Sequence, residues 1–204
     1  MNRQREIIYS ERDKVLYGDK LREHIFEMID DVIEGLLGTY VHPDTREEDK
    51  NPAGLVEAVK ARFGMDLQNV IGDSTDVDPL RELLVERVRE HYENRERHFS
   101  AERMYYLTKY VVLQVIDSKW KEHLHSLDTL KEGIGLRAYG QRDPLVEYKR
   151  EAFALFEAMI DAIKEDIVEL LFHVQVVREQ DMPQPIVLSK TQFLHPEAER
   201  IPQF

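Results

Sequence analysis

One stretch decides the fold predicted for this chain: residues 117–150 read DSKWKEHLHSLDTLKEGIGLRAYGQRDPLVEYKR. Apolar residues recur up to its centre at the spacing of a single helical stripe. They are Leu113, Ile116, Trp120, Leu124, Leu127 and Leu130. The stripe stops at Gly133 and Gly135, because glycine is a poor helix former with access to positive φ. A second stripe follows Pro144, which suits the first turn of a helix. It consists of Phe153, Phe156, Ile160, Ile163, Ile167 and Leu170. Two such stripes predict an antiparallel hairpin of helices whose tip, about 134–143, is held out at one end.

The composition sets broad limits on function. With 204 residues the chain has room for one or two domains, and 42% apolar residues suffice for a core. The formal net charge of −12 argues against a general nucleic-acid binder, whose affinity comes mainly from Lys and Arg on phosphates. It also disfavours adsorption to an anionic membrane by net charge, although a local basic cluster leaves contact with such a surface open.

The absence of cysteine excludes disulfides and thiolate metal sites, and it is compatible with a reducing cytoplasm. Residues 1–14 lack the apolar core of a signal peptide. No apolar run approaches the roughly 20 residues of a membrane span.

The rest of the chain also favours an all-α fold. Helical patterns cover about 1–17, 19–37, 55–63, 79–99, 101–132 and 144–176. Prolines and glycines punctuate residues 38–79, and 65–71 is expected to form a brief turn. Ser100 is predicted to cap the helix that begins at Ala101. Four prolines and no sustained periodicity predict a mobile tail over 177–204.

Catalytic patterns are weak. No GxxxxGK[ST] phosphate loop is present, so the chain is not expected to hydrolyse ATP. Glu122, His123, His125 and Asp128 form the nearest metal-like cluster, but histidines two apart on a helix point away from each other. One Glu-x-x-His pair is too little for a carboxylate-bridged metal bundle. Ser118, His125 and Asp128 form a hydrolytic triad on paper only, because a helix provides no oxyanion hole. Surface or interhelix histidines are the favoured interpretation.

Two features suggest contacts with other molecules. Trp120 is favoured as a core residue, with docking on a neighbouring domain as the alternative. The run Arg137-Ala138-Tyr139-Gly140-Gln141-Arg142 places an aromatic ring between cations at an exposed tip. A plain solvated turn remains the simpler interpretation. The functional interpretation is a contact patch, in which Tyr offers a rigid amphipathic face and Arg and Gln offer hydrogen bonds to any backbone.

At these residues the chain resembles a known family. The tip pattern LR-x-Y-x-Q-x-DP followed by EYKRE is similar to the C-terminal part of SecA, the bacterial motor of preprotein translocation. MNRQREIIYSERDKVL at residues 1–16 resembles the middle of the long scaffold helix of SecA. The resemblance covers about residues 1–176. It implies a helical scaffold domain over 1–17 and 100–176, which includes a two-helix finger, and a helical wing domain over 18–99.

The resemblance also implies a function. In SecA the finger tip contacts the translocating polypeptide at the entrance of the SecY channel, and Tyr139 matches the tyrosine that touches it. Leu136, Arg137, Gln141 and Asp143 are expected in the same loop. The implied partners are unfolded preprotein, the SecYEG channel and the SecA nucleotide-binding domains, at the cytoplasmic face of the inner membrane. ATP and magnesium would bind those domains, so no cofactor is expected in this chain.

The chain departs from the family pattern in several respects. The nucleotide-binding domains, the preprotein cross-linking domain and the cysteine-rich zinc-binding tail are missing, and Met1 matches an internal position of the scaffold helix. We therefore expect a fragment, a misread start or a deliberately shortened protein. With the first helix shortened, Ile7 and Ile8 are expected to lack part of their cover. Ala138 stands where glycine is expected.

Three hypotheses follow from the sequence. The first is a module that grips polypeptide and transmits force within a translocase. The second is a structural and regulatory module that docks on motor domains and restrains their ATPase. The third, which the sequence supports least, is an independent metal-dependent enzyme using Glu122 and His125.

Overall fold

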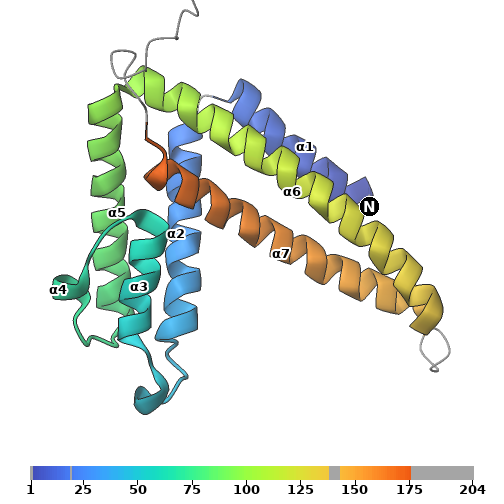
Figure 1. Cartoon of the computed structure of the whole chain (residues 1–204), viewed down its shortest axis with the longest axis horizontal. Helices are drawn as coiled ribbons and strands as arrows, with labels where there is room; N and C mark the ends of the chain where they lie inside the picture. Colours follow the sequence, from blue (N-terminus) through green and yellow to red (C-terminus); the bar gives the residue numbers. More distant parts are fainter. Residues whose placement is uncertain (1, 19, 138–142, 176–204) are drawn as a thin grey trace, which may run out of the picture. The chain divides into compact units, whose positions relative to one another are not determined.

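The computed structural model describes residues 2–18, 20–137 and 143–175, and it gives side chains for these except 135–137. The predicted tail over 177–204 lies outside the described residues. The described part forms helices and turns without a strand (Figure 1), which confirms the predicted all-α class. The helices are α1 (Asn2–Tyr17), α2 (Leu21–Tyr40), the 3-10 turn η1 (Glu47–Asp49), α3 (Pro52–Phe63), α4 (Gln68–Ile71), α5 (Val77–Phe99), α6 (Ala101–Arg137) and α7 (Pro144–His173).

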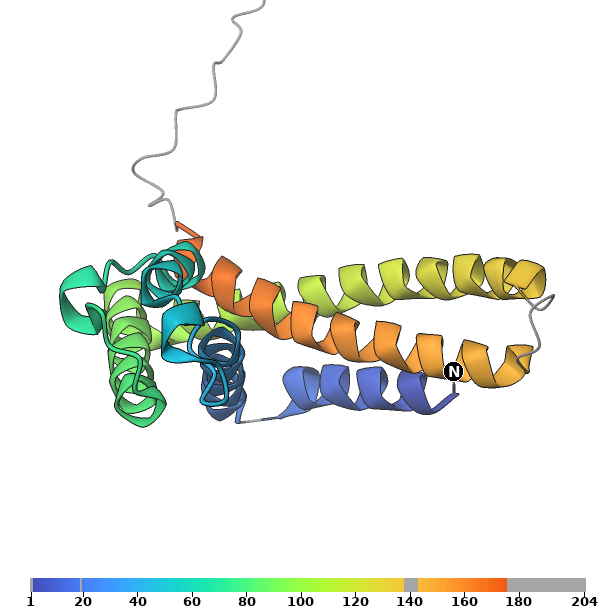
Figure 2. The ribbon, with the colours of Figure 1, turned by 90° about the horizontal axis from the view of Figure 1, so that it is seen from below.

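The long helices α6 and α7 pack against each other as an antiparallel hairpin (Figures 1 and 2), and α1 packs along α6 (Figure 1). Three side-chain contacts join Leu16 to Lys109, Arg12 to Asp117 and Gln4 to His123. The residue number falls along α1 as it rises along α6, so the two helices run antiparallel. At 1.5 Å per residue, the 37 residues of α6 make a rod about 55 Å long.

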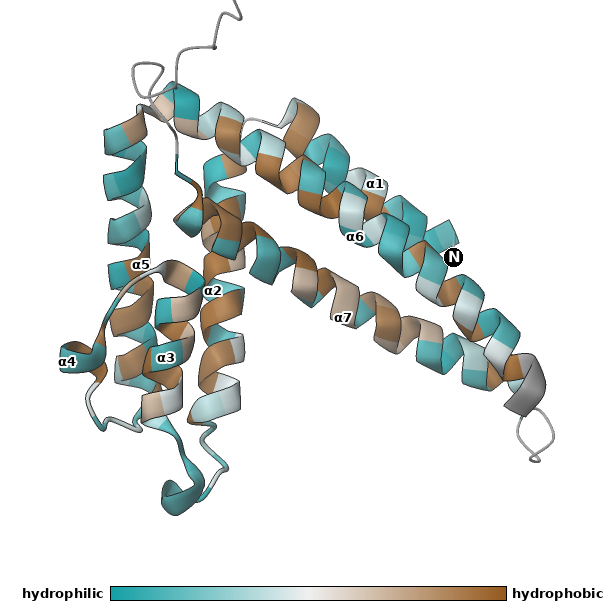
Figure 3. Cartoon of the chain, in the orientation of Figure 1, coloured by the Kyte–Doolittle hydropathy of each residue, from teal (hydrophilic) through white to brown (hydrophobic). Residues whose placement is uncertain are grey.

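The shorter helix α2 packs against α3, α5 and α7, and α3 also packs against α7. Tyr92 of α5 meets Phe172 near the C-terminal end of α7. Apolar residues face inward along these helices (Figure 3), and the buried core runs without interruption from α1 to α7. Phe63 of α3 meets Phe172 of α7 edge to face, with ring centroids 5.3 Å apart. Met1–Val174 is a single compact unit. The division into scaffold and wing domains stays a prediction.

Local sequence explains where the helices begin and end. The side chain of Asn51 accepts a hydrogen bond from the Gly54 N–H at 2.8 Å and caps α3 ahead of Pro52. Gly64 ends α3 in the left-handed conformation, with φ of 66°. Ser100 occupies the cap position of α6, since its carbonyl accepts the first helical bond from Met104. Its φ of 73° lies in a region where non-glycine residues are strained.

The predicted end of the first hairpin helix was wrong. We expected the helix to stop at Gly133, whereas α6 continues over Gly133 and Gly135 to Arg137. Glycine in a helix interior costs only about 1 kcal/mol relative to alanine. Packing offsets that cost here, because Ile134 is buried. The hairpin tip is therefore shorter than the predicted range 134–143.

Some of the predicted buried residues were also wrong. Phe153 and Leu170 of α7 are 58% and 47% exposed. Their neighbours Ala152 and Leu171 are buried instead. Apolar residues occur on several sides of α7, so periodicity alone could not choose the inward row. The expectation for α1 was right for Ile7, which is 36% exposed, and wrong for Ile8, which is buried in the core at 2% exposure.

Candidate interaction tip of the hairpin

The tip joins the end of α6 to the start of α7, and the structure places only part of the predicted contact residues. Tyr139 and Gln141 lie outside the described residues. Leu136 and Arg137 belong to the last turn of α6 and not to a loop, which corrects the expectation that they share a loop with Tyr139. Helical backbone at Leu136 and Arg137 fixes the direction in which α6 delivers the chain into the tip.

Asp143 has a structural role at the other side of the tip. Its carboxylate accepts a hydrogen bond from the Leu145 N–H at 2.9 Å and so caps α7 ahead of Pro144. The cap satisfies one of the free amides of the first turn, and its negative charge suits the positive end of the helix dipole. Asp143 therefore positions the start of α7. A role in direct contact with polypeptide stays a prediction.

Sequence reasoning missed an exposed apolar surface beside the tip. Leu145, Val146 and Phe153 of α7 are 57%, 58% and 58% exposed, and we call these three residues the distal apolar face. Val146 and Phe153 are seven residues apart, which places them on the same side of the helix. The apolar pair after Asp143-Pro144 was a signal for this surface. Exposed apolar surfaces of this kind are typical of sites that contact another molecule.

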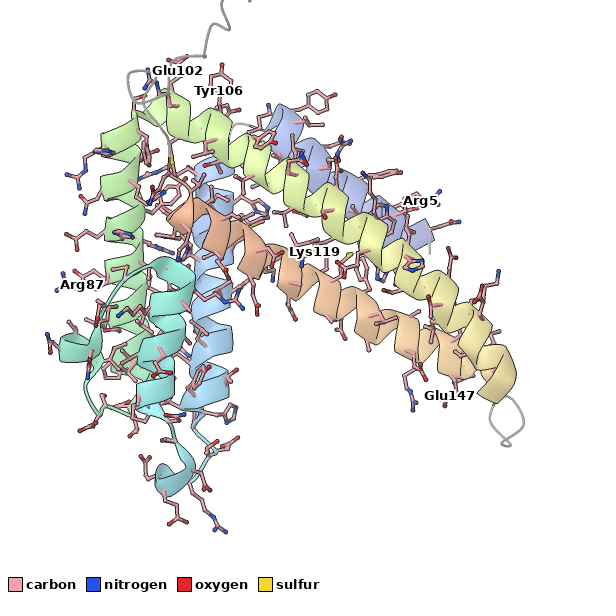
Figure 4. All side chains as sticks on the ribbon, viewed as in Figure 1. Arg5, Arg87, Glu102, Tyr106, Lys119 and Glu147 are labelled. Carbon is pink, nitrogen blue, oxygen red and sulfur yellow. The ribbon has the colours of Figure 1, made fainter. Side chains whose placement is uncertain are left out.

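Charged pairs lie along the hairpin behind the tip, and one of them joins its two helices. Lys119 of α6 forms an ion pair with Asp166 of α7 at 2.8 Å, and the hydrogen bond that Lys119 donates to Asp166 raises the pKa of Lys119. Nearer the tip, Arg150 pairs with Glu147 at 2.6 Å within α7. Figure 4 labels Lys119 midway along the hairpin and Glu147 close to its tip. Exposed pairs of this type contribute about 0–1 kcal/mol each.

Trp120 and His123 lie near the middle of α6, where the half of the hairpin that carries the tip begins. Trp120 is half-buried and packs on the core, with its ring 5.5 Å from that of His123. His123 is buried at 3% exposure and lies 5.7 Å from the ring of Phe156. His123 is thus an interhelix histidine, as the favoured interpretation had it. Docking of Trp120 on another domain stays a prediction.

The residues weighed for catalysis do not come together into a site. Ser118, His125 and Asp128 are all exposed on α6. Across the described ranges, no group of three or more His, Cys, Asp or Glu could hold a metal ion. Within the same ranges, no helix combines the length and the apolar character needed to cross a membrane.

Comparison with known proteins identifies similar sequences. The model of the SecA wing and scaffold domain matches residues 1–175. The protein translocase subunit SecA of Syntrophobacter fumaroxidans is 41% identical over 184 residues, which cover 89% of this chain and 22% of that relative. SecA of Carboxydothermus hydrogenoformans is 43% identical over 183 residues, 89% of this chain and 21% of the relative. SecA of Geobacter metallireducens is 43% identical over 184 residues, which cover 89% of this chain and 20% of that relative. The chain thus spans about a fifth of the length of the curated relatives it matches.

Proposed function

The chain belongs to the SecA wing and scaffold family, and from that premise we propose that it is the part of a protein translocase that presents the α6–α7 tip to an unfolded preprotein at the SecY channel. In this proposal the tip residues Leu136, Arg137, Tyr139 and Gln141 contact the passing polypeptide. ATP and magnesium act elsewhere, in nucleotide-binding domains, and this region itself is not an enzyme. The assembly works at the cytoplasmic face of the inner membrane, where it associates peripherally.

The observation that carries the proposal is the hairpin itself. Two helices of 37 and 30 residues pack along each other and deliver the tip at one end. Such a pair resists bending, so a force applied at its base moves its tip. The distal apolar face adds exposed Leu145, Val146 and Phe153 in the first turns of α7. Apolar and aromatic groups of this kind bind extended chains without selecting one sequence.

Site-specific cross-linking tests the contact. Residues 1–175 of this chain replace the matching region of the SecA from Carboxydothermus hydrogenoformans, which is 43% identical. A photo-reactive phenylalanine analogue then replaces Tyr139, and a preprotein is stalled during transport. We expect the preprotein to be captured at Tyr139. Tyr110, which is 63% exposed on α6 far from the tip, serves as the matched control and should capture little.

The two results have opposite meanings for the proposal. Capture at Tyr139 that disappears when the preprotein is omitted supports direct contact. If a chimaera that transports preprotein never captures it at Tyr139, or captures it equally at Tyr110, the contact role is wrong. Replacing Val146 and Phe153 together by serine should reduce capture while leaving the fold intact, because both side chains are exposed.

A second candidate function rests on a different surface. Tyr9 and Tyr17 of α1 and Tyr106 and Tyr110 of α6 are between 52% and 85% exposed, and Figure 4 shows Tyr106 directed away from the helices. Exposed tyrosines are common anchors at protein interfaces. Through them this module would dock on the nucleotide-binding domains and restrain their ATPase. Tyr106→Ser with Tyr110→Ser should then raise basal ATP turnover in the chimaera, and unchanged turnover would refute this role.

A further inference from the structure

The side chain of Gln4 joins three helices at one point. Its amide nitrogen Nε2 donates a hydrogen bond to the carbonyl oxygen of Ala152 on α7, at 3.2 Å. Its amide oxygen Oε1 lies 3.3 Å from Nε2 of His123 on α6. Gln4 itself is part of α1 and is half-buried. We refer to Gln4, His123 and Ala152 as the three-helix clasp.

The chemistry of the partners fixes the direction of both bonds. A carbonyl oxygen only accepts, so Ala152 must receive the amide N–H, and the amide oxygen then faces the imidazole. The opposite amide orientation would set two carbonyl oxygens against each other. Because burial lowers the pKa of His123, its ring is neutral at pH 7 and must carry its proton on Nε2 to donate to Gln4. All three groups are therefore satisfied by one arrangement.

Three further contacts join α1 to α6 and α2. Arg12 donates to the Asp117 carboxylate at 3.2 Å, and Lys109 donates to the Leu16 carbonyl at 2.8 Å. Both partners of α1 in these bonds belong to α6. His24 of α2 lies 3.4 Å from the Glu11 carboxylate. Gln4 differs from these residues, because its hydrogen bond to the Ala152 carbonyl joins α1 to α7.

The packing next to the clasp leaves α1 and α7 apart. A groove of about 340 Å³ lies between α1 and α7. Ile7 and Ile8 line it from α1, and Ile160 and Ile163 line it from α7. Apolar contact across this groove is therefore incomplete. The Gln4 side chain bridges α1 and α7 beyond the end of the groove, at the level of Ala152. Loss of that bridge would remove a direct link between α1 and α7 and leave the bonds of α1 with α6 in place.

We propose that Gln4 is a positioning residue that locks α1 to both helices of the hairpin, so that α1 and the tip move as one body. This inference rests on the proposed function, because a rigid joint matters when force must travel from α1 to the tip. The clasp lies near the start of α1 and in the distal half of the hairpin, where a bond limits the swing of the tip more than a bond at its base does. The resemblance to SecA assigns no role to Gln4, His123 or Ala152.

Distance measurements on the whole chain test the joint directly. The chain has no cysteine, so pairs of spin labels can be attached without a background. Arg5→Cys with Glu157→Cys reports the distance between α1 and α7, and Lys121→Cys with Glu157→Cys reports the distance between α6 and α7. All three positions are exposed, and Figure 4 labels Arg5 on the outside of α1.

The informative variant is Gln4→Glu. A carboxylate keeps the acceptor for His123 but has no N–H for Ala152, so it removes the α7 bond selectively. We expect the α1–α7 distance distribution to broaden, with about two- to tenfold more of the separated population, which is the effect of losing one net hydrogen bond. The α6–α7 distribution should not change. Arg12→Leu, which removes a tie to α6 alone, is the control and should leave the α1–α7 distribution narrow.

Further outcomes separate this inference from the proposed function. Equal widths for wild type and Gln4→Glu, or equal broadening by Arg12→Leu, would overturn the joint. In the chimaeric motor, Gln4→Glu should increase the ATP hydrolysed per preprotein moved, while Tyr139 still captures the preprotein. Unchanged ATP consumption would refute the coupling role even if the distances broaden. Absence of capture in the wild-type chimaera would refute the proposed function and leave the distance result standing.

Discussion

Replacing Gly133 with alanine should stabilise this protein, although glycine there was first interpreted as the end of a helix. α6 continues over Gly133 to Arg137, and a Cβ built at Gly133 meets no atom within 4 Å. Alanine is about 1 kcal/mol more favourable than glycine in a helix interior, and no clash reduces that gain. For a folded unit of this size the melting temperature should rise by about 2–4 °C.

Chemical denaturation measures the change, with two other glycines as references. Gly35 lies within α2, and a Cβ there also meets nothing within 4 Å, so Gly35→Ala should gain about as much as Gly133→Ala. Gly64 has a φ of 66°, and an alanine in that conformation costs about 1 kcal/mol. The slope of unfolding free energy against denaturant should stay the same in all three variants.

The comparison has a clear negative result. If Gly35→Ala stabilises and Gly133→Ala does not, the last turns of α6 are not helical in solution, and the tip begins near Gly133 as the sequence pattern indicated. The proposed rigid delivery of Tyr139 would then fail as well, because Leu136 and Arg137 would belong to a loop.

Three further predictions concern strain, packing and pH. Ser100→Gly should raise the free energy of unfolding by about 1 kcal/mol, since φ of 73° is strained for serine, and unchanged stability in urea would contradict this. Phe63→Ala should lower it by about 3–5 kcal/mol, because the ring is fully buried against Phe172, and a loss under 1 kcal/mol by the same assay would show that the site is loosely packed. Burial lowers the pKa values of His91 and His123, so the unfolded chain binds protons first as pH falls below the ordinary value of 6.5. Stability should therefore decrease below pH 6.5, and urea midpoints that do not change between pH 7.5 and 5.5 would refute it.

The sequence was sufficient for the helices but not for every face of them. The helical spacing of apolar residues predicted α2, α5, α6 and α7, because this periodicity is a strong signal over 20 residues or more. It could not choose between Phe153 and Ala152 for the inward row of α7, since residues 152–156 are all apolar. That choice depends on which partner helix covers the surface, and sequence periodicity carries no information about partners.

The candidate site shows a similar limit. The motif around Tyr139 located the tip and its family, yet it could not reveal that Asp143 caps α7 or that α6 extends through Gly135. Both features follow from packing and capping at the ends of helices. The clasp of Gln4 was also outside the reach of the sequence, because its two partners are 119 and 148 residues away. Contacts at that separation are fixed only once the helices are arranged in space.

The position of α7 in the core has a consequence for synthesis of the chain. Arg62 of α3 bonds Glu169 of α7, 107 residues later, and Phe172 completes the aromatic cluster around Phe63. At about 5–20 residues per second, a ribosome needs roughly 5–20 s to supply that partner. During this interval α7 does not yet cover the apolar faces of α2, α3 and α5, and a chaperone has time to bind them. A protein proposed to bind unfolded chains thus itself remains partly unfolded for seconds during its synthesis.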